Sequence, residues 1–107
     1  MKWYNDLYVG HNAMEDKDKI VDKINRGKLQ LNKYVITLPL NNRDTLDIYP
    51  AYVLVQKWYR KSDMIVVGIA DGKEEANEIV EMIIKDCLSE LGKVDVRQYI
   101  ESKMKEA

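Results

Sequence analysis

The sequence predicts a single α/β domain over residues 1–107, in which a small, mainly parallel sheet of two or three strands is covered by helices in the order βαβαβαα. The first observation is the stretch from Met64 to Ala70, which is apolar throughout. A strand of this kind is usually buried on both faces, as in a parallel or mixed sheet. The second observation is the amphipathic helix that follows it, and the third is another apolar strand at residues 33–40.

The N-terminal part predicts an edge strand at residues 6–10, in which Leu7 and Val9 share one face. A helix is expected next, from about residue 13 to residue 26. Asn12 and Glu15 match a capping box at its start. Its apolar stripe consists of Met14, Ile20, Val21 and Ile24.

The middle of the chain combines one clear strand with one ambiguous segment. Residues 33–40 contain β-branched apolar residues and reach Pro39, and a polar loop follows them. Residues 47–60 fit a strand or a helical stripe equally well. Pro50 favours a helix that begins near it, because the first turn of a helix does not need that N–H group.

The strongest helical periodicity lies in the C-terminal part, where apolar residues recur from Ala76 to Leu91. Asp71 with Glu74 predicts a cap at the start of this helix, and Gly92 predicts its end. A last helix is expected to begin at Asp95.

Composition excludes several broad classes of protein. Seventeen basic and 18 acidic side chains give a net charge of −1, so no overall field favours nucleic acid or an anionic membrane. The apolar runs are far shorter than the roughly 20 residues of a membrane span, and the N-terminal residues lack the apolar core of a secretory signal. The single cysteine, Cys87, excludes an intramolecular disulfide. We therefore expect a cytoplasmic protein without a membrane partner.

Three polar loops follow the three predicted strands, and parallel strands would bring them to one edge of the sheet. They offer a histidine, amides, cations, a carboxylate and two helix N-termini that attract anions. This edge predicts a site for a small anion or nucleotide-like ligand, with or without turnover. The alternative is structural, because Asn12 and Asp71 also fit as helix caps and the paired asparagines as turn residues. The candidate ligand-binding residues are His11, Asn41, Asn42, Arg43, Asp71, Gly72 and Lys73.

No residue pattern specifies a catalytic centre. His11 is the only histidine, and no motif assigns it a Ser or Cys partner. Cys87 falls on the apolar stripe of its helix, where a thiol behaves as a core residue. A His/Cys cluster for metal and a P-loop before Gly72 are both missing from the sequence. We predict no catalytic residue, metal or cofactor, and we favour a non-enzymatic role.

Residues 57–61 (KWYRK) place two aromatic side chains among three basic ones, as in grooves that bind single-stranded nucleic acid. The interpretation that we favour is a helix end whose Trp58 packs inward and whose cations face solvent. Trp3, Tyr4, Trp58 and Tyr99 are candidates for a protein interface, because Trp and Tyr are enriched in interfaces. The partner would be another protein or a second copy of this chain in a homodimer.

Five segments, among them residues 34–38 (YVITL) and 65–70 (IVVGIA), resemble small uncharacterised bacterial proteins of the Clostridia type. The resemblance covers most of residues 6–100 and implies a stand-alone intracellular protein, with no activity, cofactor or catalytic residue to carry over. Our hypotheses from the sequence are, in order, a protein-interaction domain, a small-anion or nucleotide-like site, and single-stranded nucleic-acid binding. The segments are residues 6–10 (DLYVG), 34–38 (YVITL), 65–70 (IVVGIA) with 72–76 (GKEEA), and 95–100 (DVRQYI).

Overall fold

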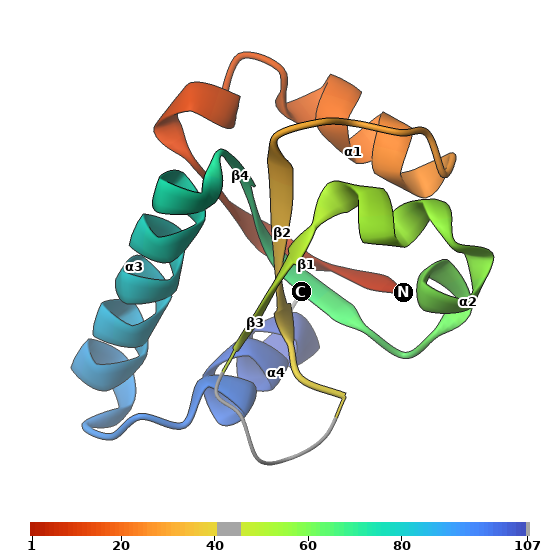
Figure 1. Cartoon of the computed structure of the whole chain (residues 1–107). Helices are drawn as coiled ribbons and strands as arrows, with labels where there is room; N and C mark the ends of the chain where they lie inside the picture. The colour runs from red at the N-terminus through yellow and green to blue at the C-terminus, as the bar shows by residue number, and fades with distance from the viewer. Residues whose placement is uncertain (41–45, 107) are drawn as a thin grey trace.

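A four-stranded mixed sheet forms the centre of the computed structural model (Figure 1). The structure describes residues 1–40 and 46–106. The spatial order of the strands is β1-β4-β2-β3, so that β4 and β2 are central and β1 and β3 are the edges. The strands are β1 (Lys2–Val9), β2 (Lys33–Leu38), β3 (Asp47–Pro50) and β4 (Ile65–Asp71).

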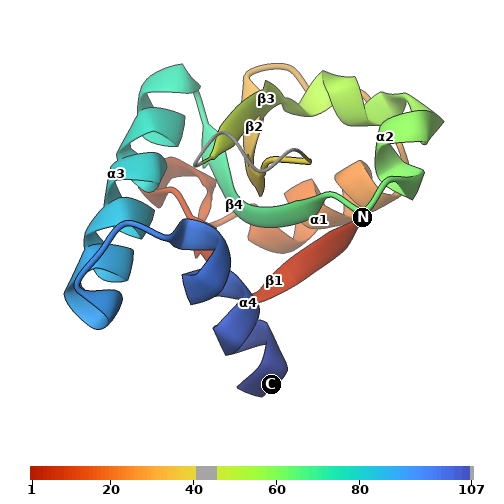
Figure 2. The ribbon, with the colours of Figure 1, turned by 90° about the horizontal axis from the view of Figure 1, so that it is seen from below.

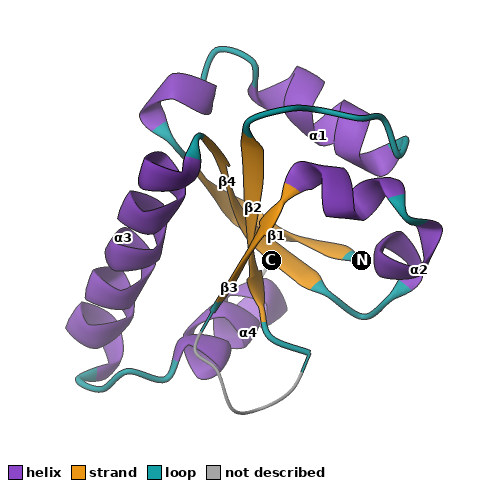
Figure 3. Cartoon of the chain, in the orientation of Figure 1, coloured by secondary structure: helices purple, strands orange, loops and turns teal. Residues whose placement is uncertain are grey.

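The prediction of a mainly parallel sheet with two or three strands is wrong. Only β1 and β4 pair in parallel, whereas β2 runs antiparallel to both β4 and β3. The apolar pattern could not distinguish these arrangements, because a central strand that is covered on both faces is apolar whatever the direction of its neighbours. The general class, a sheet with helices on its faces, is as predicted (Figure 3).

The helices lie on both sides of the sheet (Figure 2). Helices α3 and α4 pack against one face, and α1 and η2 contribute to the core on the other. No helix in the described ranges combines the length and apolar character that a bilayer span requires. The helices are η1 (His11–Ala13), α1 (Lys17–Asn25), η2 (Ala51–Val55), α2 (Lys57–Lys61), α3 (Lys73–Leu91) and α4 (Val96–Glu106).

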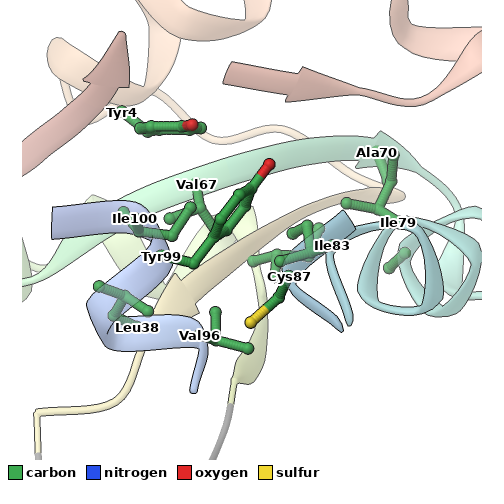
Figure 4. Close-up of a cluster of buried hydrophobic side chains, with 12 residues drawn as sticks. Tyr4, Leu38, Val67, Ala70, Ile79, Ile83, Cys87, Val96, Tyr99 and Ile100 are labelled. Atoms are coloured by element: carbon green, nitrogen blue, oxygen red, sulfur yellow. The ribbon is translucent and has the colours of Figure 1, made fainter. Parts of the chain in front are cut away.

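Two hydrophobic clusters, one on each face, explain the unbroken apolar sequence of β4. Val67 and Ala70 belong to the cluster under α3 and α4, whereas Val66 and Ile69 belong to the opposite one. Neighbouring side chains of a strand point to opposite faces. The alternation in β4 is interrupted once, where its register with β2 shifts between Ile36 and Thr37, and both faces of the strand are buried. This confirms the burial predicted from the sequence. Figure 4 shows the cluster under α3 and α4, whose labelled members are Tyr4, Leu38, Val67, Ala70, Ile79, Ile83, Cys87, Val96, Tyr99 and Ile100.

The segment around Pro50 differs from the predicted helix. It forms edge strand β3 over Asp47–Pro50, then the 3-10 turn η2, and then the five-residue helix α2. Ile48 and Tyr49 pair with β2, and Pro50 is tolerated because β3 is an edge strand. The aromatic residues that fitted both patterns are therefore divided between a strand and a short helix.

The first part of the chain also departs from expectation. Strand β1 begins at Lys2 rather than residue 6, and the expected helix over residues 13–26 is divided into η1 and α1. The predicted capping box does not form, because the N–H of Asn12 donates to the carboxylate of Glu75 instead. Met14, which we placed on the apolar stripe, is 60% exposed.

The ends of the C-terminal helices agree better with the sequence. Gly92 ends α3 with φ +71°, the left-handed conformation that favours glycine. Helix α4 begins at Val96, and Oδ1 of Asp95 accepts the N–H of Gln98 at 3.1 Å. This is the arrangement of an N-cap.

Candidate functional site

The carboxyl ends of β1 and β4 meet at one edge of the sheet. The N–H of Gly10, directly after β1, donates to the carbonyl of Ile69 in β4 at 2.9 Å. The chain continues from β1 into η1 and from β4 into α3. The segment that begins with His11 and the segment that begins with Gly72 therefore lie at the same edge of the sheet.

The strand before the third predicted loop, β2, ends elsewhere. Leu38, the last residue of β2, pairs with Ile65, the first residue of β4. An antiparallel strand ends where its neighbour begins, so the chain leaves β2 at the opposite end of the sheet. The expectation that the carboxyl ends of three parallel strands share one edge is therefore wrong. The candidates Asn41, Asn42 and Arg43 lie outside the described residues.

Glu75, in the first turn of α3, joins the two loops that do meet. Its Oε2 accepts the N–H of Asn12, and its Oε1 accepts the N–H of Asp71, each at 2.9 Å. The residue is only 7% exposed. Gly10 is needed beside it, because a Cβ at that position would lie 1.8 Å from Oε1 of Glu75. One carboxylate thus holds the end of β4 and the start of η1 together.

Asp71 is not the cap of α3 that the sequence predicts. Its carboxylate accepts the side-chain amide of Asn32 at 3.0 Å and pairs with the ammonium of Lys33 at 3.1 Å. Gly72, at φ +96°, takes the N-cap position without a side-chain hydrogen bond to the helix. The N–H of Gly72 donates to the carbonyl of Asn32 at 2.8 Å. Asp71 therefore attaches the start of α3 to the chain before β2.

Three neighbouring hollows lie around η1 and the first turns of α3, with volumes of about 460, 360 and 220 Å³. Each hollow has lining residues in common with the other two, because His11, Asn12, Met14, Glu75 and Glu78 each line two of the three. We therefore treat the hollows as one surface and call it the edge groove. Its lining residues are Val9, Gly10, His11, Asn12, Met14, Glu15, Asp71, Gly72, Lys73, Glu74, Glu75, Glu78, Ile79 and Met82.

The edge groove combines apolar side chains with an acidic lining. Met14 is 60% exposed and Met82 is 49% exposed, and both line the smallest hollow. The lining includes five carboxylates and a single ammonium, that of Lys73. This ammonium lies over the ring of Tyr34, 5.8 Å from its centroid. The electrostatics therefore favour a cation over an anion, despite the helix N-terminus at this edge.

His11 lies at the surface of the edge groove. The imidazole is exposed in η1 and lines two of the hollows. The hydrogen bonds recorded for the edge groove hold its loops together through Glu75 and Asp71. Within residues 1–40 and 46–106, no group of three or more His, Cys, Asp and Glu side chains is placed to hold a metal ion.

The four candidate interface residues have different environments. Tyr4 and Tyr99 are buried in the core under α4, at 3% and 7% exposure, so they are not surface residues (Figure 4). Trp3 is half-buried, and its indole N–H donates to Oδ1 of Asn25 at 2.9 Å. Trp58 is 67% exposed. Of the four, Trp58 therefore offers the largest exposed fraction to a partner.

Trp58 stands on a basic surface that α2 presents. The indole meets the ring of Tyr59 edge-on, with centroids 4.8 Å apart, and Tyr59 packs against the core. Arg60 is turned away, because its guanidinium donates to the carbonyls of Leu54 and Val55 at 2.9 and 2.7 Å. A hollow of about 420 Å³ lies beside the indole. The residues beside this hollow are Lys57, Trp58, Lys61 and Ser62. We call this group of residues, with the exposed indole of Trp58, the α2 knob.

Sequence reasoning missed the residues that organise the edge groove. Glu75 follows Gly72 by three residues, the spacing of the acid in a capping box, but we assigned that role to Glu74 by counting from Asp71. Asn32 was missed because nothing in its sequence neighbourhood indicates its φ of +62°. Met82 lies off the apolar stripe of α3 and is exposed. A large apolar residue at such a position was the available signal of a binding surface.

A second set of side-chain hydrogen bonds centres on Tyr8, beside α3 and α4. The hydroxyl of Tyr8 donates to Oδ2 of Asp86 at 2.5 Å and lies 3.1 Å from the hydroxyl of Tyr99. Burial and then the bonds to Asp86 and Tyr99 raise the pKa of Tyr8 far above its ordinary value. These contacts join β1, α3 and α4, so their role is structural.

Comparison of the chain with known protein families, curated proteins and solved structures found no match.

Proposed function

We propose that this chain is a protein-interaction domain whose edge groove binds a basic segment of a protein through a large apolar side chain. The observation that carries the proposal is the pair of exposed methionines, Met14 and Met82, in one hollow lined by Glu75 and Glu78. Methionine side chains adapt to the shape of an apolar partner, and they are frequent at binding surfaces. The carboxylates would select a cationic segment by charge complementarity.

We favour a partner that binds in the edge groove over a partner that adds a strand to the sheet, because both edge strands are irregular. In β1, Trp3 pairs with Val66 and Tyr8 pairs with Gly68, so the register shifts between them. In β3, the strand has four residues and ends at Pro50. Bulges, short edge strands and prolines all oppose pairing with another chain.

The same charges weigh against the small-anion or nucleotide-like ligand that we considered for this edge. The exposed carboxylates of Glu15, Glu74 and Glu78 would repel a phosphate, and the ammonium of Lys73 lies over the Tyr34 ring. A non-enzymatic role also fits an exposed His11 without a catalytic partner in the sequence. We propose a cytoplasmic setting because a single buried thiol, Cys87, suits a reducing compartment.

Two fluorescein-labelled model peptides test this proposal, one made of Leu and Lys and the other of Leu and Glu. Each is about 18 residues long, roughly five turns as an amphipathic helix. Fluorescence anisotropy at low salt should show binding of the Leu/Lys peptide with a Kd of about 1–100 µM, and no binding of the Leu/Glu peptide. Equal binding of both peptides, or binding of neither, would contradict the proposal.

Two pairs of variants locate the binding surface. Met82→Ser should weaken binding of the Leu/Lys peptide by about tenfold or more, since burial of a methionine contributes roughly 1.5–3 kcal/mol. Leu88→Ser is the control, because Leu88 is also 49% exposed on α3 but does not line the groove. Likewise Glu78→Lys should weaken binding, whereas Glu81→Lys, an exposed position outside the groove, should not.

A further inference from the structure

The chain carries a basic, apolar surface of its own that matches the chemistry of the edge groove. The α2 knob presents the exposed indole of Trp58 between the ammonium-bearing side chains of Lys57 and Lys61. The groove presents exposed methionines beside the carboxylates of Glu75 and Glu78. A tryptophan with flanking cations is a typical anchor for an apolar hollow with an acidic rim.

We propose that the occupant of the edge groove is the α2 knob of a second copy of this chain. The inference rests on the proposed function, because it names the partner of the same groove. In this arrangement the indole of Trp58 from one copy would contact Met14 and Met82 of the next. Lys57 and Lys61 would approach the acidic residues along the groove, which include Glu15, Glu74 and Glu78.

The α2 knob is held firmly enough to act as an anchor. Tyr59 packs against the core and supports the indole of Trp58 edge-on. The guanidinium of Arg60 fixes the helix to the carbonyls of Leu54 and Val55. A side chain that is already supported loses less conformational entropy on binding, so more of the contact energy remains as affinity.

The positions of the two surfaces determine the kind of assembly. Helix α2 lies at one end of the molecule, and η1 with the start of α3 lies at the other (Figures 1 and 2). A copy that inserts its knob into the groove of a neighbour leaves its own groove free at the far end. The contact is therefore heterologous and propagates head to tail, giving a ring or an open chain rather than a closed two-fold dimer.

Light scattering coupled to size-exclusion chromatography tests this assembly over a concentration series. The wild-type mass should rise from the 12.5 kDa of the monomer through the dimer to larger species. It should fall again when salt is raised from about 0.05 M to 0.5 M, because the charged contacts are screened. A wild-type chain that stays at 12.5 kDa up to millimolar concentration would overturn the inference.

A mixing experiment separates head-to-tail contact from other kinds of self-association. Trp58→Ala removes the knob and keeps the groove, whereas Met82→Ser with Glu78→Lys impairs the groove and keeps the knob. Each variant alone should remain a monomer, and an equimolar mixture should form a dimer that grows no further. Leu88→Ser is the matched control and should assemble like the wild type. A mixture that stays monomeric, although the wild type assembles, would overturn the inference.

The failure of this inference can be told apart from failure of the proposed function. All the substituted side chains are exposed, and circular dichroism would confirm that the variants are folded. If the wild type is monomeric but the Leu/Lys peptide still binds in a Met82-dependent way, then the partner is not a second copy of this chain. The proposal that the edge groove binds a basic segment would remain supported. Trp58-dependent retention of single-stranded DNA by a strictly monomeric chain would overturn the inference in favour of a nucleic-acid role for the knob.

Discussion

Replacing Glu75 with alanine should destabilise the protein by about 2–4 kcal/mol. The substitution leaves the N–H groups of Asn12 and Asp71 without the carboxylate that accepts both of them at 2.9 Å. A hydrogen bond to a charged group contributes roughly 1.5–3 kcal/mol. Asn12 is exposed and its N–H can reach water, so the expected loss lies below the full sum of two such bonds. Urea unfolding followed by circular dichroism measures the free energy of unfolding directly.

Glu75→Gln separates charge from shape at this position. Glutamine retains one carbonyl oxygen, so it can accept one of the two N–H groups, and we expect about half of the loss. Glu74→Ala is the control, since Glu74 is exposed in the same turn of α3, and its effect should stay within about 0.5 kcal/mol. If Glu75→Ala is as mild as this control, the two loops are held by other contacts and the reasoning fails.

Gly10→Ala tests the same contact from the opposite side. The added Cβ would lie 1.8 Å from Oε1 of Glu75, although Gly10, at φ −61°, has a backbone conformation that alanine adopts easily. The steric cost should therefore depend on the Glu75 side chain. In a double-mutant cycle, Gly10→Ala should be much less harmful in the Glu75→Ala background. Simple additivity of the two losses would contradict a direct contact between these residues.

Three further predictions concern the core. Thr37→Val should raise the free energy of unfolding by about 1 kcal/mol, because Oγ1 of Thr37 is buried and has no hydrogen-bond partner among the described residues; a loss on urea unfolding would show that the hydroxyl is satisfied. Burial, followed by the charge of Tyr99, raises the pKa of Tyr4 to about 12. Its contribution to stability should therefore be complete below pH 10, the value for an unfolded tyrosine, and should be lost as the pH rises toward 12. Urea unfolding at pH 8 and pH 11 should show this decline in the wild type, and Tyr4→Phe should reduce it; an equal decline in both proteins would contradict the assignment. The thiol of Cys87 is fully buried, so a thiol reagent should modify it at the rate of unfolding, with reaction accelerating in parallel with urea denaturation. Immediate modification of the native protein would contradict its place in the core.

Burial could be predicted where the apolar pattern is strong, in β4 and α3, but not at Met14 or at Trp58, which we expected to pack inward and which is exposed. The directions of the strands could not be predicted. The unbroken apolar pattern of residues 64–70 places β4 in the centre of a sheet, and the position of Cys87 on the stripe of α3 places it in the core. Strand direction depends on how the chain crosses between elements. The short connection from β2 to β3 leads to an antiparallel pair, and residues 47–50 were not identified as a strand. The error at one ambiguous segment therefore changed the class of the whole sheet.

The same error affected the candidate site. Because β2 is antiparallel to β4, its carboxyl end lies at the end of the sheet away from Gly10 and Gly72. Most of the charged residues that line this edge are acidic. We therefore propose a cationic partner in place of the anion that we considered from the sequence. The spacing of Glu75 from Gly72 was a local signal for its bond to Asp71, but its bond to Asn12 spans 63 residues of sequence. Long-range contacts of this kind have no local signal.

The exposed methionines connect the fold to the proposed binding function. A single exposed apolar residue is normal for a folded protein, and neither Met14 nor Met82 would need an explanation alone. Here they come from elements far apart in sequence and line one hollow. Glu75 holds η1 to α3 and thereby keeps the two methionines together. If the groove binds a partner, Glu75→Ala should weaken binding even under conditions where the variant is fully folded, whereas a groove formed by chance would show no such coupling.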